Sequence, residues 1–510
     1  MTIDASPKTR AWIIAAMVFV LGFDLAFLWQ RRAGATTSEF GGHPEEAAHY
    51  VTGLAVQNYL AHNFGTAPQN SLAEFSTHYP IVRSLAPAPL FPVALATWTS
   101  VFGKSRTSVL LLMCFLAALV ALLLHLAVRR EFGDAAGAIA AALFLSLPLV
   151  REHTATLLPA LLCTVFMFAA ALAFARLIER ARIADGLWFG LCAALALLTD
   201  RAALALLLFI PLALGLSGKW RLLTRPAFWI GLALTAPPVS HFRTTDWTRV
   251  SVDFTRAAAP FYAAQLAAAV GAILLLIEVP SLIAKICRPA ERTARWSAAA
   301  ALLLGIVVFI VLFPAELEAH RVLPALPAAL MFAIAGCATI AKRFGRSTGF
   351  ILLLAGVLTL VLSETVMVTW RTKKWSGFQL LAGIVLNSGE HPQARILVCS
   401  DPTGEGMFIS EIALGEPRPA RLIERADTLF ANTKFADDES LANLIGAHRF
   451  DYIVFDESNP DLDHANQHDM LRRVLREPSD RFWEMSSAPV IRDGLPQDQP
   501  ARLYRVTGKN

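Results

Sequence analysis

Residues 11–29 read AWIIAAMVFVLGFDLAFLW, an apolar run that follows Lys8 and Arg10. A helix of about 20 apolar residues crosses the roughly 30 Å hydrocarbon core of a bilayer. The run is long, it is aromatic near its end, and no small-x-small cleavage site precedes Gln30. It therefore predicts a retained signal-anchor rather than a cleaved signal peptide, and with it a chain that enters the membrane at its first helix.

The composition of the 510-residue chain agrees with this prediction, since 55% of its residues are hydrophobic and only 17% are charged. A soluble domain could not bury so much apolar surface, because surface-to-volume scaling limits its core. The net charge of +5 comes mostly from short loops, which is an orientation signal and not a nucleic-acid signal. Six scattered cysteines form no CxxC pair, so neither a disulfide framework nor a zinc motif is indicated.

Ten more apolar stretches bring the predicted number of membrane spans to eleven. Lys and Arg concentrate in alternate loops on the same side as the N-terminus, and these loops are therefore predicted to be cytoplasmic. An additional apolar piece, Leu85 to Phe102, starts with three prolines and is predicted as a juxtamembrane helix, since one more span would invert every later loop. The ten stretches are residues 109–128, 135–150, 155–176, 185–199, 201–217, 226–240, 260–284, 296–314, 321–341 and 348–369.

The composition changes at about Lys373, where charged residues become frequent and the long apolar runs end. Arg395–Cys399 and Asp451–Phe455 are typical of buried strands, and Ser440–Ala447 and His464–Arg476 of helices. We expect a membrane domain over residues 1–372, with a long first outer loop at 30–108, and a small α/β domain with a parallel or mixed sheet over 373–510. Eleven spans with the N-terminus inside would place that domain on the outer side of the membrane. No G-x-G-x-x-G or P-loop indicates a nucleotide site.

The stretch Gly41–Tyr50, GGHPEEAAHY, lies on the predicted outer side and carries two adjacent carboxylates. Glu45 or Glu46 could act as a general base on a reacting hydroxyl or amine. Both also suit the first turn of a helix after Pro44, where acidic residues favour the helix dipole. Adjacent helical residues point in different directions, so we expect only one of the two to face a site, and the sequence leaves open which.

Histidines and tyrosines near this turn are candidate substrate-binding residues. They are His49 and Tyr50, with His78 and Tyr79 further along the same loop. The two tyrosines are equally typical of a membrane interface. Metal ligation by His43, His49 or His78 lacks a fixed ligand spacing, so no cofactor is implied and a divalent metal stays open.

Three arginines on the predicted outer side are candidate phosphate ligands. Arg201 and Arg321 head later spans, and Arg83 precedes the proline-led helix. A guanidinium group can hold a phosphate through two parallel hydrogen bonds. The alternatives are an ion pair with the neighbouring Asp200 or Glu318, or snorkelling towards the membrane interface. Glu318 is itself counted among the candidate substrate-binding residues.

Four motifs together resemble the GT-C class of integral-membrane glycosyltransferases, in particular the bacterial aminoarabinose transferase and protein mannosyltransferase-like group. The first is the Glu45–Tyr50 turn in a long outer loop, and the second is His78–Pro80 with its proline-led helix. The others are Arg129–Gly133 and Glu318–Pro327, before a late span. The resemblance covers roughly residues 10–370.

The resemblance implies a transferase that moves a sugar from a polyprenyl-phosphate-linked donor to a lipid or glycan acceptor on the periplasmic face. Members usually carry Asp-Glu in the first loop, with the acid as base, and Glu45 stands at the place of that Asp. They often carry a second acid before a proline at the fourth span, whereas Thr156–Pro159 contains none; Glu152 is a nearby substitute. They often have Lys-Gly where this chain has Asp200-Arg201.

Two other classes compete with a transferase. The missing second acid also fits a catalytically degenerate relative that serves as a membrane scaffold or glycolipid binder. A transporter or flippase is less favoured, because the chain shows no related halves and its first loop is long and polar. The expected partners are the lipid-linked donor, an acceptor and membrane lipids, and the sugar is not specified by the sequence.

Overall fold

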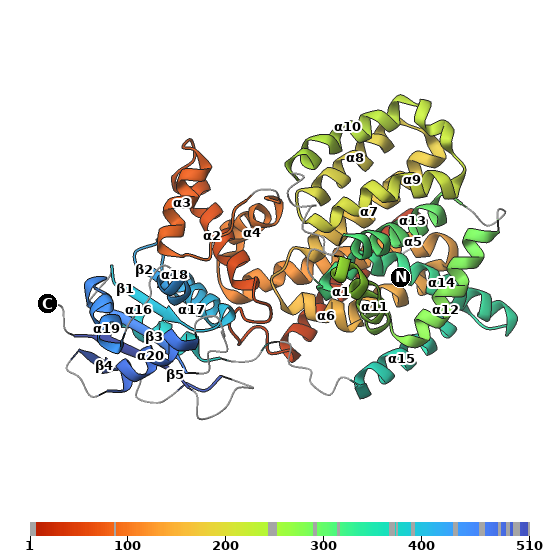
Figure 1. Ribbon diagram of the computed structural model, residues 1–510. Coiled ribbons are helices and arrows are strands. Elements are labelled where there is room, and N and C mark those ends of the chain that lie inside the picture. The colour runs from red at the N-terminus through yellow and green to blue at the C-terminus, as the bar shows by residue number, and fades with distance from the viewer. Residues whose placement is uncertain are drawn as a thin grey trace, which may run out of the picture.

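The protein has a helical part and a smaller sheet domain, side by side in the computed structural model (Figure 1). Helices of the first loop lie between the two parts. The structure describes residues 7–85, 88–242, 252–288, 293–313, 317–366, 373, 376–388, 393–431, 437–457, 465–477, 481–485, 490–492 and 500–507. His464, the first residue of a predicted helix, lies outside these residues.

Five helical segments are long and apolar enough to cross a membrane, or six if one bent pair counts as a span. This confirms a multi-pass integral membrane protein, but several of the eleven predicted spans are shorter than a full crossing. The five segments are α1 (Pro7–Arg32), α5 (Arg106–Ser146), α7 (Ala160–Arg180), α13 (Ala294–Leu312), and η5 (Ala319–Ala325) continued by α14 (Leu326–Arg343). Four more predicted spans are the helices α8 (Ile183–Leu197), α9 (Leu206–Ser217), α10 (Pro226–His241) and α15 (Thr348–Val366).

Helix α5 contains two of the predicted spans, which are separated at Gly133. That residue has φ 87° and ψ 168°, a conformation that glycine adopts and L side chains rarely do. The chain folds back there, because a Cβ atom on Gly137 would lie 2.7 Å from Nδ1 of His125 and 3.0 Å from its carbonyl oxygen. Residues twelve positions apart in a straight helix would be roughly 18 Å apart.

The span predicted at 260–284 is instead a bent pair of helices. Helices α11 (Val252–Val270) and α12 (Ala272–Cys287) meet at an angle of 108°. The break falls at Gly271, which has φ 86°, and a Cβ atom there would lie 2.1 Å from a methyl group of Thr359 on α15. The predicted span is therefore broken near its middle, which the apolar composition alone does not reveal.

The first loop forms three helices, α2 (Glu46–His62), α3 (Pro68–His78) and α4 (Leu90–Phe102). Helix α4 is the predicted juxtamembrane helix. Its 13 residues span roughly 20 Å, too short for a hydrocarbon core of roughly 30 Å. This length agrees with the prediction that α4 is not a full span.

The C-terminal domain is built on a five-stranded mixed sheet, in the order β2-β1-β3-β5-β4. Strands β2, β1 and β3 are parallel, and β5 joins β3 and β4 in antiparallel pairing. The predicted strands and the mixed sheet are confirmed. The elements are β1 (Arg395–Cys399), β2 (Leu422–Arg425), β3 (Tyr452–Asp456), β4 (Phe482–Glu484) and β5 (Ala501–Val506), with helices α16 (Phe378–Asn387), α17 (Pro402–Gly415), α18 (Ala426–Ala431), α19 (Asp438–Ala447) and α20 (Ala465–Arg476).

Alternate residues of the central strands pack on opposite faces of this sheet. In β1, Ile396 and Val398 belong to the core shared with the helical part, whereas Leu397 and Cys399 belong to a separate core that contains residues of α19 and α20. This follows from the two-residue period of a strand. One face of the sheet therefore ties the domain to the helical part.

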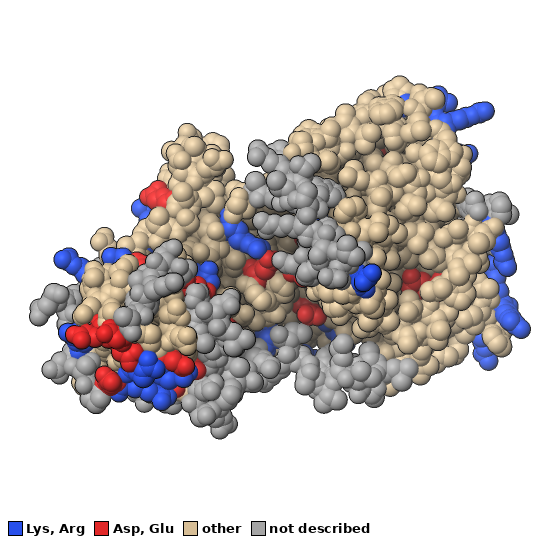
Figure 2. Space-filling model, viewed as in Figure 1, with Lys and Arg blue, Asp and Glu red and all other residues tan. Residues whose placement is uncertain are grey.

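The sheet domain is fixed to the helical part by α17, which packs against α2. Arg106, at the start of α5, forms a buried ion pair with Glu411 of α17. The carboxylate of Glu39 accepts hydrogen bonds from the backbone N–H groups of Ser376 and Gln379. Figure 2 shows basic side chains at the end of the helical part away from this domain, as expected for a cytoplasmic face.

Candidate active site

A cavity of about 470 Å³ lies between the first loop and the ends of several helices. Figure 2 shows acidic and basic side chains in the hollow between the two parts. The cavity brings together six residues that the sequence analysis selected from distant segments. They are Glu45, His49, Arg83, Arg201, Glu318 and Arg321.

Glu45 is the N-cap residue of α2 and faces the cavity. Its Oε1 atom is 2.6 Å from Nη2 of Arg83, and its Oε2 atom is 3.8 Å from Nε2 of His49. The interaction with His49, followed by that with Arg83, holds the pKa of Glu45 well below its usual range, although burial opposes this. Glu45 is therefore an ionised carboxylate paired with a guanidinium group that is itself open to the cavity.

Glu46 is fully buried and points away from the cavity. Its Oε1 atom lies 2.5 Å from Nζ of Lys373 and accepts the N–H of Leu157 at 3.0 Å, and its Oε2 atom accepts the N–H of Gly42 at 2.9 Å. The first loop passes close to Thr156 at this point, because a Cβ atom on Gly42 would lie 2.6 Å from a methyl group of that residue. The expectation of a catalytic role for Glu46 is corrected: the residue locks the loop in place.

Three residues predicted to bind substrate lie at the interface with the sheet domain or in the core, and not in the cavity. The buried Tyr50 hydroxyl donates to the carbonyl of Lys104 at 2.8 Å, and burial raises the pKa of this phenol. The Tyr79 hydroxyl donates to Glu416 at 2.5 Å, and Nδ1 of His78 lies 2.9 Å from the carbonyl of Arg421. These residues belong to the same predicted loop as the Glu45 turn, but their side chains contact the junction with the sheet domain and not the cavity.

The η5 segment supplies the opposite wall of the cavity. Glu318 accepts hydrogen bonds from Nε and Nη2 of Arg321, at 3.3 and 3.1 Å, which is the ion pair considered in the sequence analysis. Nε2 of His320 lies 3.4 Å from the same carboxylate. Arg201 and Asp200 line the cavity from the start of η1 (Arg201–Ala205), where Asp200 accepts the N–H of Ala202 at 2.7 Å.

Comparison with known proteins bears on the family and the fold. Residues 86–242 match the family model described as dolichyl-phosphate-mannose-protein mannosyltransferase. A search of curated proteins found no match. The crystal structure of ArnT from Cupriavidus metallidurans in the apo state has a TM-score of 0.61 and 13% identity, with 98% of each chain covered.

Two further structures have the same kind of fold. ArnT from Cupriavidus metallidurans bound to undecaprenyl phosphate has a TM-score of 0.57 and 14% identity, and the match covers 95% of this chain and 97% of that one. The Archaeoglobus fulgidus oligosaccharyltransferase in complex with Zn and sulfate has a TM-score of 0.54 and 13% identity, covering 87% of this chain and 68% of that one. The fold is that of ArnT, and it is shared in large part by this oligosaccharyltransferase. The resemblance inferred from the four sequence motifs is thereby confirmed.

The resemblance described in the sequence analysis implied a second acid where this chain has Thr156–Pro159. Here the N–H of Leu157 binds Glu46 instead. Glu152, considered as a substitute, does not line the cavity among the described residues. Burial raises its pKa, and the nearby His43 opposes this effect. Beside Glu45, the acids that line this cavity are Asp200 and Glu318.

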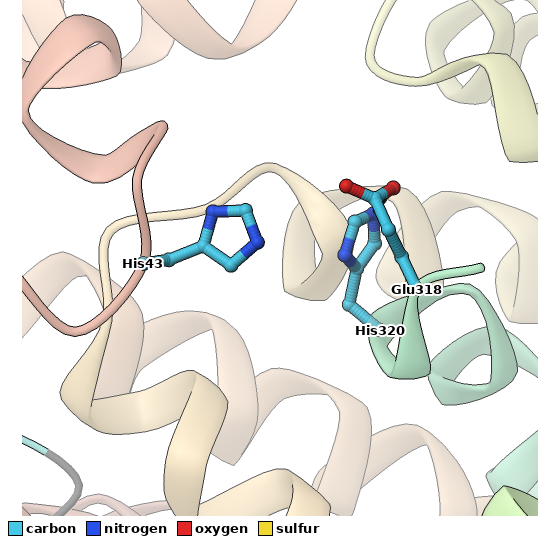
Figure 3. Close-up of side chains that lie close together, drawn as sticks. All are labelled: His43, Glu318 and His320. Carbon is cyan, nitrogen blue, oxygen red and sulfur yellow. Dashed lines mark ion pairs between the residues drawn. The ribbon is translucent and has the colours of Figure 1, made fainter. Parts of the chain in front are cut away.

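His43, Glu318 and His320 are the candidate metal ligands of the site. Figure 3 shows the ring of His43 reaching from the first loop towards the other two, which lie on the η5 segment. One ligand atom from each lies within 4.8 Å of the others, and two imidazoles with a carboxylate form a set that zinc uses in proteins.

The present contacts of these residues do not fit a preformed metal centre. Nδ1 of His43 accepts the N–H of Glu45 at 3.2 Å, which leaves the proton of a neutral imidazole on Nε2. Arg321 already neutralises Glu318. A cation would have to replace both interactions, so the arrangement is that of a hydrogen-bond network beside the cavity.

Sequence reasoning left two residues out of the selected site. His320 lines the cavity and approaches Glu318, and Asp200 lines it beside Arg201. The sequence analysis considered Asp200 only as an ion-pair partner and included His320 only within the Glu318–Pro327 motif. Their position could have identified them, since each lies next to a candidate phosphate ligand at the outer end of a predicted span.

Proposed function

We propose that this protein is a membrane glycosyltransferase that moves a sugar from a polyprenyl-phosphate-linked donor to an acceptor on the periplasmic face. The observation that carries the proposal is the shared cavity, in which an ionised Glu45 lies with Arg83, Arg201 and Arg321. One carboxylate and three guanidinium groups are the charges needed to accept a proton and to hold a phosphate. The GT-C fold supports the proposal.

The donor phosphate binds to the arginines in this mechanism. Guanidinium groups form paired, charge-assisted hydrogen bonds with phosphate oxygens. Arg321 and Arg201 lie at the helix ends and Arg83 at the opposite side of the cavity, so the phosphate bridges the two walls. ArnT from Cupriavidus metallidurans binds undecaprenyl phosphate, which is a ligand of the same chemistry.

A neighbouring groove suits the lipid tail of the donor. Its volume is about 610 Å³, and it shares Arg83 and Ser84 with the cavity. Its walls include Leu72, Val82 and Leu198. A polyprenyl chain lying along this groove would keep apolar surface out of water and present its phosphate at Arg83.

Arg83 then controls the base. In the empty cavity Arg83 holds Glu45 as a stable carboxylate, and a carboxylate with such a low pKa is a weak base. When the donor phosphate takes the guanidinium group, Glu45 loses part of this stabilisation and its pKa rises towards the ordinary value. Binding of the donor therefore activates Glu45 towards the acceptor.

The transfer is a single displacement. The acceptor oxygen or nitrogen forms a bond to the anomeric carbon of the sugar while the bond from that carbon to the phosphate oxygen breaks. The leaving polyprenyl phosphate keeps the electron pair, and its charge is balanced by the arginines. Glu45 accepts the proton of the acceptor, and the anomeric configuration is inverted.

The remaining topology is part of the same proposal. Counting the bent pair and the shorter apolar helices among the predicted spans as crossings, eleven crossings from a cytoplasmic N-terminus put the cavity and the domain at 373–510 in the periplasm of a bacterial inner membrane. The alternation of basic loops supports this orientation. The domain at 373–510 then covers the first loop, and its place beside the cavity suits contact with a lipid or glycan acceptor.

The test is transfer by the purified protein from a synthetic polyprenyl-phosphate sugar. Wild-type protein should release polyprenyl phosphate and form an inverted glycoside with an envelope lipid extract as acceptor. Donor binding without release, under conditions in which a GT-C transferase of known activity is active, would instead support the degenerate glycolipid binder. The absence of an acid from Thr156–Pro159 is the observation that favours this second candidate.

A further inference from the structure

A second cavity of about 280 Å³ lies between α5, α7, α8 and α13. Its inner wall is made mostly of alanines and leucines, including Leu123, Leu126 and Leu172. Its charged lining residues are three arginines, Arg130, Arg176 and Arg295, and one acid, Glu179. A cavity with an apolar wall and a cationic rim matches an amphipathic ligand that is anionic at one end. None of its lining residues belongs to the cavity around Glu45.

The second cavity lies at the opposite end of the membrane helices. Arg106, at the start of α5, pairs with Glu411 of the sheet domain. At about 1.5 Å of rise per residue, Arg130 lies roughly 35 Å further along the helix, which exceeds a hydrocarbon core of roughly 30 Å. The rule of positive loops inside assigns this end to the cytoplasmic face.

The positive charges around this cavity are only partly neutralised. Arg176, Arg180 and Arg295 all repel the charge of Arg130, and Glu179 alone opposes them. The charge of Arg295 is offset separately, because its Nη1 atom lies 3.2 Å from Oε1 of Glu131.

Neither Arg130 nor Arg176 forms an ion pair within the part of the chain that the structure describes. The Nε atom of Arg176 is buried and has no hydrogen-bond partner there. A buried N–H group without a partner costs free energy comparable to a lost hydrogen bond. The described part of the cavity therefore offers one acid, Glu179, to three arginines, and leaves the Nε–H group of Arg176 without an acceptor.

We propose that this cavity binds the phosphate of an anionic phospholipid headgroup, held by Arg130 and Arg176, with an acyl chain along the leucine wall. Basic pockets between membrane helices on the cytoplasmic side bind such headgroups. A guanidinium group matches a phosphate with two parallel hydrogen bonds. Trp188 lines the same cavity and is 57% exposed, as is typical of an aromatic side chain at the membrane interface.

A free phosphate ion offers the same oxygens to the arginines. The structure favours the lipid, because an acyl chain would remove the apolar surface of the leucine wall from water, whereas a phosphate ion would leave it exposed. The experiment therefore compares the two sources directly. The full-length protein is purified in a neutral detergent, and binding is measured by thermal unfolding and native mass spectrometry with dioleoyl phosphatidylglycerol, dioleoyl phosphatidylcholine or sodium phosphate.

Phosphatidylglycerol should bind and raise the melting temperature, whereas phosphatidylcholine and sodium phosphate should not. Arg176→Gln and Arg130→Gln should each weaken phosphatidylglycerol binding about tenfold, the loss expected for one charge-assisted hydrogen bond. Arg343→Gln is the matched control, since Arg343 is an exposed arginine in the last turn of α14 and lies outside the cavity. Its binding of phosphatidylglycerol should stay unchanged.

Equal binding of both lipids by the wild-type protein would overturn the proposal, and so would unchanged phosphatidylglycerol binding in the Arg130→Gln/Arg176→Gln variant. Stabilisation by sodium phosphate equal to that by phosphatidylglycerol would overturn the assignment to a lipid. If Arg176→Gln does not fold, Arg176→Lys keeps the charge but loses the paired donors, and its binding should still weaken. None of these outcomes depends on sugar transfer.

Discussion

Glu45 and Glu46 are neighbours in the chain, yet they belong to two different regions of the molecule. Glu45 faces the cavity, where its partner Arg83 is exposed to solvent and to a ligand. Glu46 is sealed in the protein, where Lys373 and two backbone N–H groups hold it. The difference teaches that the chemistry of a carboxylate depends on whether a ligand can compete for its partner. A donor phosphate can displace the exposed Arg83 from Glu45, whereas the buried Lys373 is closed to such a ligand.

The largest expected effect separates the two glutamates by activity. Glu45→Gln should lower the rate of sugar transfer by about 10²–10⁴-fold, because the amide cannot accept the proton of the acceptor. The release of polyprenyl phosphate from a synthetic donor measures this rate, and the melting temperature checks that the fold is kept. Transfer at the wild-type rate by Glu45→Gln would remove Glu45 from the mechanism.

The next effect separates the two glutamates by stability. Glu46→Gln leaves the buried ammonium group of Lys373 without its counter-charge, and breaking such a buried pair costs about 3–5 kcal/mol. Thermal unfolding in detergent should show a clear fall in melting temperature. The double variant Glu46→Gln/Lys373→Met removes both charges and should recover part of the loss. A melting temperature unchanged in Glu46→Gln would show that the pair does not lock the loop.

Arg83→Gln tests, through the pH dependence of the transfer rate, whether the exposed partner of Glu45 controls its pKa. The pKa of Glu45 is held low by His49 and Arg83, so its carboxylate stays ionised through the ordinary range of pH. Without Arg83 the pKa of Glu45 rises, and the acidic limb of the pH–rate profile should move to higher pH. An unshifted profile, with only a weaker apparent affinity for the donor, would show that Arg83 binds phosphate without controlling the base.

The same lowered pKa makes a prediction for stability. A carboxyl group with a folded pKa below its unfolded value stabilises the protein above the unfolded pKa, and this contribution is lost as the pH falls towards the folded value. Wild-type protein should therefore lose more stability than Glu45→Gln when the pH is lowered through the ordinary carboxyl range. Parallel losses in the two proteins, followed by thermal unfolding, would contradict the low pKa.

Tyr79→Phe tests a residue that the sequence analysis listed as substrate-binding and that the structure places at the domain junction. It should leave the rate of transfer within about twofold, while the loss of the hydrogen bond to Glu416 costs about 1 kcal/mol of stability. Thermal unfolding and the transfer assay, measured on the same preparation, check both. A large loss of transfer with an unchanged melting temperature would return Tyr79 to the active site.

Metal removal should have the smallest effect. The hydrogen bond from Glu45 to His43 and the pairing of Glu318 with Arg321 occupy the candidate ligands, so EDTA should leave the transfer rate nearly unchanged. Loss of transfer with EDTA and its recovery with Zn²⁺, together with zinc in the purified protein and none in His320→Gln, would show that a cation does displace these contacts.

The sequence by itself determined the membrane class, the mixed sheet of the last domain and most of the charged residues around the cavity. The membrane class follows from the length of the apolar runs and from the alternation of charged loops, because the bilayer acts on every residue of a span alike. The strands of the sheet follow from their two-residue period. Glu45, Arg83, Arg201 and Arg321 were found because charges at the ends of spans are rare and costly.

Only the tertiary structure decided which of two adjacent carboxylates faces the cavity. It also decided that Tyr50, His78 and Tyr79 serve the domain junction and that Gly271 bends a predicted span. Each of these depends on partners far away in the chain: Lys373 for Glu46, Glu416 for Tyr79 and Thr359 for Gly271. A local pattern contains no information about such contacts, since they arise only when distant segments pack together.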